Sequence, residues 1–135
     1  KGSVILTAST TGTSGVVSDI AFQVASAAGG ESIDLTPGKT IIKYTDDTQS
    51  KIFDSTAKVT VTGLGTADSD KLLERNEVYE ISLSTLQNTA SNKNALTNTL
   101  MTNKTFSLEV IPPSGAVLFI ERTTPVFLDT TTSLN

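Results

Sequence analysis

The sequence predicts an all-β protein, and three observations carry this prediction. The 135 residues are 37% hydrophobic and only 18% charged, with threonine and serine filling much of the difference. Short clusters of valine, isoleucine, leucine and phenylalanine recur too regularly for a disordered chain. Turn-forming residues separate these clusters, which is typical of a sandwich or a barrel, and threonine packs well on a pleated surface. The length suits one domain over residues 1–135, and no internal boundary or repeat is evident.

The first half of the chain provides five of the expected strands. They are expected at residues 3–9, 16–25, 39–45, 51–53 and 57–62. In the second of these, Ile20, Phe22 and Val24 alternate with polar or small residues, so one face of that strand is expected to be buried. The stretch Thr36-Pro37-Gly38 predicts a turn, because proline pre-sets φ and glycine can supply a positive φ.

The middle of the chain is less regular. Between residues 65 and 76 the alternation stops, and we expect one short helical turn around residues 70–74. Residues 78–83 alternate again and predict a strand. Residues 86–102 are polar and rich in asparagine, which indicates either a long surface loop or one weak helix.

The last apolar segment predicts a hairpin. Phe106, Leu108 and Val110 alternate with polar residues, a turn follows at residues 112–115, and residues 117–122 return. We expect the first strand of the pair to lie in the interior. The run 116–120 is apolar on both faces, so its strand is expected to be central and covered on both sides, or else to face a neighbouring subunit.

The composition argues against an enzyme. The chain contains no histidine and no cysteine, which removes the commonest general base, the commonest metal ligand and the best nucleophile. No glycine-rich segment follows a strand and opens a helix, so a phosphate-binding loop is not expected. The net charge of −4, with no basic cluster, makes nucleic acid and anionic membrane surfaces poor partners. No stretch approaches the ~20 apolar residues that a membrane span requires.

The chain contains two local acidic clusters, and one of them is a candidate metal site. Asp68 and Asp70 alternate in a loop, and calcium takes oxygen ligands at alternating loop positions. The loop lacks the glycine and the distal glutamate of an EF-hand, so a solvated acidic turn is the alternative. Asp46-Asp47 reads as a loop tip, where replacement of Asp46 is expected to change stability by less than about 0.5 kcal/mol. No other cofactor is expected.

One glycosylation sequon is present. Asn103-Lys104-Thr105 lies just before the strand that begins at residue 106, where an acceptor asparagine would be accessible. Such triplets also arise by chance in a chain rich in asparagine and threonine. Asn103 is therefore a candidate for glycosylation.

The last third of the chain resembles the C-terminal segment of archaeal flagellins, the archaellins. In residues 106–125, FSLEVIPPSGAVLFIERTTP, a strand ends in a Pro-x-Gly-Ala turn, and an apolar return strand is followed by Glu-Arg-Thr and a proline. Ile33-Asp34-Leu35 followed by residues 40–44, and residues 73–77 leading into residues 79–83, are also similar to the archaellin pattern. The matches occur in the family's order through most of the chain.

The resemblance implies an immunoglobulin-like antiparallel β-sandwich of about eight strands with little helix. It also implies a structural subunit of the archaeal motility filament, surface-exposed and extracellular, in contact with copies of itself or related flagellins. The long hydrophobic N-terminal helix of archaellins is absent here, so the chain is expected to be the soluble head. Its end matches the end of archaellin chains, and the hairpin is expected to close the sandwich. The isolated head is expected to be a monomer or at most a weak associate.

Two other function classes stay open. A soluble domain of an archaellum accessory protein, or of a type IV pilin-like protein that binds the surface layer, would have the same general plan. The Glu-Arg-Thr-Thr-Pro segment with its upstream Pro-Pro-Ser-Gly turn favours the archaellin. A carbohydrate-active sandwich enzyme ranks third, because a convincing carboxylate pair and an aromatic platform are both missing.

Overall fold

The protein is an all-β sandwich, as predicted. The computed structural model describes residues 4–25, 32–53, 59–65, 70–84, 86, 96, 98–113 and 117–134. Within these ranges the structure contains strands and no helix, and therefore no helix that could cross a membrane. The strands are β1 (Val4–Thr10), β2 (Val16–Ala25), β3 (Ile33–Asp34), β4 (Ile41–Asp46), β5 (Ser50–Phe53), β6 (Val59–Leu64), β7 (Leu72–Leu73), β8 (Val78–Leu83), β9 (Thr105–Ile111), β10 (Leu118–Thr123) and β11 (Thr131–Leu134).

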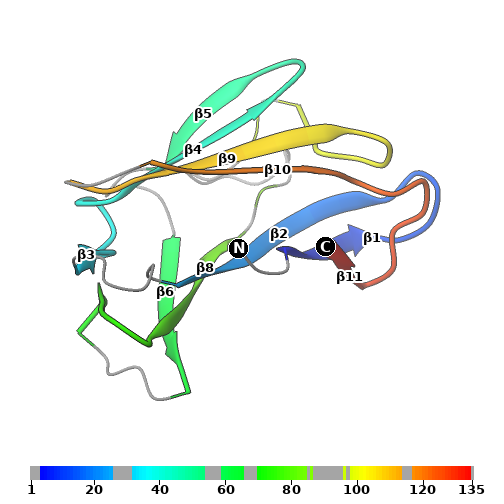
Figure 1. Ribbon diagram of the computed structural model, residues 1–135. Coiled ribbons are helices and arrows are strands. Elements are labelled where there is room, and N and C mark those ends of the chain that lie inside the picture. Colours follow the sequence, from blue (N-terminus) through cyan, green and yellow to red (C-terminus); the bar gives the residue numbers. More distant parts are fainter. Residues whose placement is uncertain are drawn as a thin grey trace.

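The strands form two main layers (Figure 1). One sheet has the order β11-β1-β2-β8-β6, and the other has the order β10-β9-β4-β5. The short pair β3-β7 lies at one end of the sandwich. All neighbours in the two main sheets are antiparallel. The eight strands expected from the sequence are present, and β3, β7 and β11 are additional.

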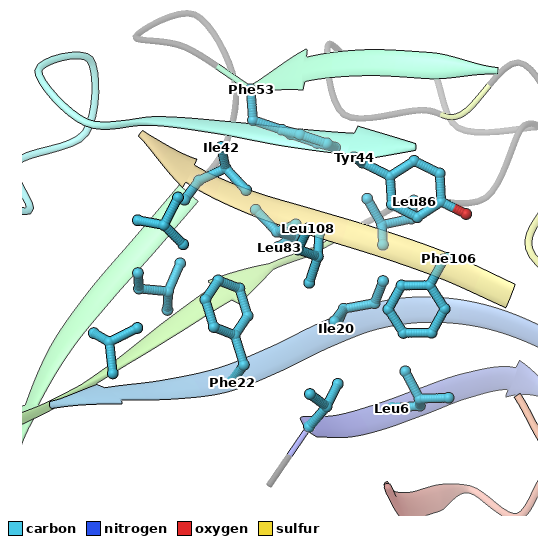
Figure 2. Packing of buried hydrophobic residues seen from close by; sticks show 14 of the residues in the cluster. Leu6, Ile20, Phe22, Ile42, Tyr44, Phe53, Leu83, Leu86, Phe106 and Leu108 are labelled. Atoms are coloured by element: carbon cyan, nitrogen blue, oxygen red, sulfur yellow. The ribbon is translucent and has the colours of Figure 1, made fainter. Parts of the chain in front are cut away.

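The core forms where the alternating apolar faces of the two sheets meet. Ile20, Phe22 and Val24 of β2 are buried, as their alternation predicted. Leu108 of β9 is fully buried on the opposite sheet, which confirms that β9 is an interior strand. Figure 2 shows the side chains of both layers pointing into the space between them. The rings of Tyr44 and Phe106 stack there, with centroids 6.1 Å apart.

Three leucines of the asparagine-rich segment belong to this core. Leu86, Leu96 and Leu100 are each at most 1% exposed. Backbone bonds attach them, since Leu86 donates to Ser18 O (2.8 Å) and Val17 donates to Leu100 O (2.9 Å). Residues 87–95 and 97 lie outside the described residues, so the choice between a loop and a weak helix stays open there. The described parts are anchored to β2 rather than lying free on the surface.

The predicted helical turn at residues 70–74 is wrong. Lys71 has a φ of 62°, which is incompatible with a right-handed helix, and Leu72–Leu73 forms β7, paired with β3. Leu35 donates to Lys71 O (2.8 Å), and Leu35 and Leu73 are both buried. Long-range pairing and burial of these leucines override the local helical preference.

The prediction that the return strand is central and covered on both sides is also wrong. β10 is an edge strand that pairs with β9, from Leu118↔Val110 to Thr123↔Thr105. Leu118 and Ile120 pack against the core, whereas Phe119 on the other face is 59% exposed. The hairpin itself is confirmed. Of the two alternatives, contact with a neighbouring subunit is the one that remains.

The hairpin does not close the sandwich, contrary to our expectation. After β10 the chain crosses to the other layer and forms β11, which pairs with β1 from Val4↔Leu134 to Thr7↔Thr131. The crossing is held by a bridge between Gly12 and Leu128. Leu128 is fully buried there, so the last strand is tied to the β1–β2 hairpin as well as to β1.

We expect Gly15→Ala to lower the free energy of unfolding by about 1–3 kcal/mol, because it overpacks this crossing. A Cβ at Gly15 would lie 2.8 Å from Leu128 Cβ and 2.9 Å from the carbonyl oxygen of Thr10. Urea unfolding followed by circular dichroism measures the loss. Ser14→Ala, at the exposed neighbouring position, should stay within about 0.5 kcal/mol of the parent. Equal stabilities for the two variants would show that the crossing is loosely packed.

Candidate assembly surface

The outer face of the four-stranded sheet is the first candidate surface. Because alternate residues of its strands are buried in the core, the residues between them point outward. The strand register places four outward residues in one row across the sheet: Phe119, Glu109, Lys43 and Ile52. Phe119 and Ile52, at the two ends of the row, are 59% and 57% exposed. No described strand lies over this face (Figure 1).

The exposed large apolar side chains are distributed unevenly over the described part of the protein. The six are Ile52, Met101, Val117, Phe119, Val126 and Phe127. Ile52, Val117 and Phe119 belong to or adjoin the edge strands β5 and β10 of the four-stranded sheet, whereas Met101 bridges Val16 of β2, and Val126 and Phe127 lie in the connection from β10 to β11. Exposed apolar side chains gathered on one side of a protein mark an interaction surface more often than scattered ones do. The four-stranded sheet is therefore the side expected to meet a partner.

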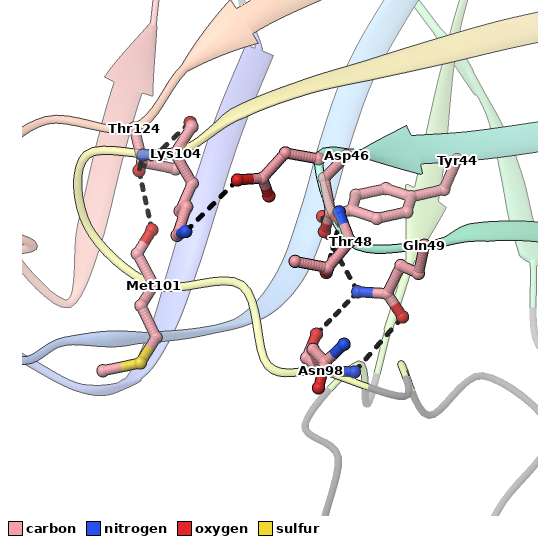
Figure 3. A network of polar contacts seen from close by, with 9 residues as sticks. Tyr44, Asp46, Thr48, Gln49, Asn98, Met101, Lys104 and Thr124 are labelled. Atoms are coloured by element: carbon pink, nitrogen blue, oxygen red, sulfur yellow. Dashed lines mark hydrogen bonds and ion pairs between the residues drawn. The ribbon is translucent and has the colours of Figure 1, made fainter.

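A polar network fixes the edge of this sheet (Figure 3). The Asp46 carboxylate accepts hydrogen bonds from the Tyr44 hydroxyl (2.7 Å), from the Thr48 backbone N–H (2.8 Å) and from Gln49 Nε2 (3.0 Å). The Gln49 amide also donates to Asn98 O (2.7 Å) and accepts from Asn98 N (3.2 Å). Asp46 is thus more than a solvated loop tip. The network joins the β4–β5 turn to the segment that leads into β9.

The network shifts the ionisation of Asp46. Partial burial alone raises the pKa of this carboxyl, but the hydrogen bonds from Thr48, Tyr44 and Gln49 outweigh burial and hold the pKa below its usual 3.8. Hydrogen bonds from Thr36, with a contribution from Lys39, likewise lower the pKa of Asp34. Burial, and the hydrogen bond to Asp46, raise the pKa of Tyr44.

We expect the domain to lose stability in acid. A carboxyl whose folded-state pKa is depressed stabilises the fold fully above its unfolded-state pKa, and that contribution is lost as pH falls through the folded-state pKa. The free energy of unfolding should therefore fall as pH drops below about 4. Asp46→Asn should flatten this decline and Tyr44→Phe should flatten it less, as measured by urea unfolding at a series of pH values. An undiminished decline in Asp46→Asn would exclude Asp46 as its source.

Comparison with known proteins identifies the family. The model of the archaeal-type flagellin family matches residues 2–122, which is most of the chain. This chain belongs to the archaeal-type flagellin family. No curated protein sequence matched it.

Two solved structures share the fold of this archaellin. Archaeal flagellin FlaB1 from Methanocaldococcus jannaschii matches with a TM-score of 0.74 and 19% identity, over 98% of this chain and 93% of that one. The archaeal flagellum of Methanospirillum hungatei strain JF1 matches with a TM-score of 0.61 and 16% identity, over 93% of this chain. This archaellin spans 63% of the M. hungatei subunit.

The structure explains part of the archaellin-like motif Glu-Arg-Thr-Thr-Pro. Thr124 is 1% exposed at the point where the chain leaves β10. Its hydroxyl donates to Met101 O (2.6 Å) and accepts from the Lys104 backbone N–H (2.9 Å), while its own N–H donates to Lys104 O (2.8 Å). Thr124 thus joins the end of β10 to the segment before β9, a role that no local pattern in the sequence indicates.

The two acidic residues proposed as metal ligands are only partly described. Asp68 lies outside the described residues. Asp70 Oδ1 accepts hydrogen bonds from the Leu72 backbone N–H (2.9 Å) and from the Tyr79 hydroxyl (3.2 Å). Within the part of the chain that the structure describes, no three acidic residues come together as a metal site. Calcium binding by the Asp68–Asp70 loop stays a prediction.

The sequon lies at an exposed turn. Asn103 has a φ of 57°, a conformation that asparagine tolerates better than most residues, and its N–H donates to Pro125 O (3.2 Å). Thr105 of the sequon lies on β9, and its hydroxyl is 2.8 Å from that of Thr123 on β10. The asparagine is accessible, as its place in the sequence predicted.

Proposed function

We propose that this archaellin chain is the surface-exposed head of a structural subunit in the archaeal motility filament. The match of the archaeal-type flagellin model over residues 2–122 carries the proposal. The exposed Val126 and Phe127, in the connection from β10 to β11, are apolar side chains available for contact with other copies or with related flagellins. A structural role also agrees with an inventory that lacks histidine and cysteine.

The proposal includes the organisation and place of the subunit. Residues 1–135 form one domain, outside the cell, and a long hydrophobic helix precedes it in the complete protein. The head has no cofactor and no contact with nucleic acid or membrane. Separated from such a helix, it is a monomer or a weak associate, because head contacts alone are small and wet.

Surface labelling of living cells tests this proposal. The chain contains no cysteine, so a single introduced cysteine reports its own accessibility. Full-length protein carrying Gln23→Cys, at an exposed position of β2, should give fluorescent filaments when swimming cells are treated with a membrane-impermeant maleimide. Leu108→Cys, at a fully buried position, is the matched control and should stay unlabelled. Labelled cell bodies without labelled filaments would favour an accessory or pilin-like protein of the cell surface.

We also propose that Asn103 carries a glycan. Its exposed turn and the strand position of Thr105 leave the acceptor amide open to a transferase. Protein purified from the native archaeal host should be heavier than its sequence mass, and Asn103→Gln should remove the difference in intact mass spectrometry. Asn76→Gln, at an exposed turn asparagine outside any sequon, is the control and should keep the extra mass. A parent protein at its sequence mass would contradict the proposal.

A further inference from the structure

The four outward residues that form one row across the four-stranded sheet are ordered so that the row is complementary to the same row of a second copy. Read from β10 to β5, it runs Phe119, Glu109, Lys43, Ile52, which is apolar, acidic, basic, apolar. The second half of the row is therefore complementary to the first half. The flanking outward positions of the two middle strands follow the same rule, since Ile111 lies beside Ile41 and Ser107 lies beside Thr45.

We propose that this outer face binds the same face of a second copy, about a two-fold axis that runs along the strands between β9 and β4. Rotation about this axis stacks β10 on β5 of the second copy and β9 on its β4. Phe119 then meets Ile52 of the second copy, Glu109 meets its Lys43, and Ile111 meets its Ile41. Each contact occurs twice, as a two-fold interface requires.

The charges on the outer face of the four-stranded sheet favour a second copy of this chain as its binding partner. Each copy carries a net charge of −4, so two copies repel unless the surfaces that meet are neutral or complementary. In the central row the single lysine of each copy faces the single glutamate of the other. Both lie between apolar side chains, an arrangement with a polar centre and apolar flanks that fixes one register.

The rim of the face is polar and sets the strength of the contact. Thr45 and Ser107, together with the acidic Asp46, Asp47 and Glu121, border a shallow hollow of about 270 Å³ at one end of the rows, and the like charge at this end weakens the contact. Four strands about 4.8 Å apart give a row only about 14 Å wide. Such an interface is small and partly wet, so pairing is expected at high local concentration, consistent with a weakly associating head.

This pairing of two heads goes beyond the proposed function. It rests on that function only for the place where it would occur, on the filament outside the cell. Successive subunits of an open helical filament meet through two different surfaces, whereas a two-fold contact closes after two copies. The face therefore joins heads of separate filaments laid side by side, or isolated heads in concentrated solution.

Charge reversal tests the pairing in the 135-residue chain. In sedimentation equilibrium over about 10 µM to 1 mM, the parent should approach twice its monomer mass at the upper end. Lys43→Glu and Glu109→Lys should each weaken dimerisation at least about tenfold, because each creates two like-charge contacts per dimer. The double swap should return to within about threefold of the parent. Arg75→Glu, an exposed change outside the face, should leave dimerisation unchanged. A monomeric parent, or a swap that fails to restore dimers, would overturn the proposal.

Cross-linking tests the orientation. Single-cysteine variants Phe119→Cys and Ile52→Cys are mixed, one of them isotopically labelled, and treated with a thiol linker of about 10 Å, the usual spacing of stacked sheets. The mixed dimer should exceed both self-linked dimers, because Phe119 faces Ile52 of the second copy and lies at the opposite edge from its Phe119. Self-linked dimers in equal amount would exclude the two-fold arrangement.

Cells separate this proposal from the proposed function. Full-length Lys43→Glu should still assemble filaments, while side-by-side bundles in electron micrographs become fewer. Loss of filaments with a folded head would place the face inside a filament and overturn the two-fold pairing. A dimer that persists in solution, with no labelled filaments on cells, would instead contradict the proposed function.

Discussion

Replacing Leu108 with alanine is expected to lower the free energy of unfolding by about 2–5 kcal/mol. Leu108 is fully buried on β9, opposite Tyr44 of β4 on one side and Ile120 of β10 on the other. Truncation removes apolar contacts and leaves a cavity that the surrounding strands cannot fully close. A loss of this size is a large share of the ~5–15 kcal/mol available to such a domain. Urea unfolding of the 135-residue chain measures it.

Ser107→Ala is the matched control for Leu108→Ala. It lies one residue away on the same strand, on the outward face, and should change stability by less than about 0.5 kcal/mol. If Leu108→Ala unfolds at the same urea concentration as Ser107→Ala, then β9 is not an interior strand. In cells, the destabilised variant should also reduce the number of filaments, because fewer folded subunits reach the surface.

Thr124→Val should cost about 2–4 kcal/mol, although it changes the volume of the side chain very little. Valine cannot donate to Met101 O or accept from the Lys104 N–H, so two backbone groups beside a buried side chain lose their partner. Each buried group left unpaired costs about 1–3 kcal/mol. Met101 and Lys104 lie in the segment just before β9, so hydrogen exchange of the Lys104 N–H should accelerate along with the loss of global stability.

The neighbouring threonine provides the control for this second variant. Thr123→Val makes the same chemical change at an exposed position, where only the hydroxyl contact with Thr105 is lost. Thr124→Ser keeps the hydroxyl and should recover most of the stability. If Thr124→Val is as stable as Thr123→Val, water or an alternative backbone pairing satisfies the two groups.

The strands that were predictable from the sequence are those with a buried alternating face. The bounds of β2 and β8 follow from Ile20-x-Phe22-x-Val24 and from Tyr79-x-Ile81-x-Leu83, because the pattern and the burial coincide. The turn before β4 followed in the same way, since Gly38 has the positive φ that its place after Pro37 suggested. In these segments local chemistry and tertiary packing favour the same structure.

The elements that were missed depend on a partner far along the chain. β7 is two leucines whose strand character comes from β3, and β11 is a threonine-rich segment whose pairing comes from β1. The start of β10 is apolar on both faces, but this pattern alone does not distinguish a central strand covered on both sides from an edge strand with one exposed apolar face. A local pattern reports which residues favour burial, and only the assembled sheets decide what covers them.

The candidate sites also divide into those that a local sequence pattern predicts and those that depend on distant parts of the chain. The Asn103 sequon is a local signal, and the structure places it at an exposed turn. The row from Phe119 to Ile52 was not predictable, because its four residues come from four strands and are aligned only by register. Likewise, Asp46 looked like a loop residue: its contact with Gln49 is local, but the contact of Gln49 with Asn98 is between residues far apart in the chain and could not be predicted.

The position of β1 between β2 and β11 has a kinetic consequence. Its partner on one side follows within the same hairpin, whereas Val4 pairs on the other side with Leu134, at the far end of the chain. Pairings over such separations carry a high loop-closure entropy, and sandwiches rich in them fold in milliseconds to seconds. On the ribosome, one edge of β1 stays open until residues 131–134 have been synthesised, and open edges recruit strands from other chains. The arrival of β11 therefore sets the earliest moment at which this edge of the domain is protected from strands of other chains.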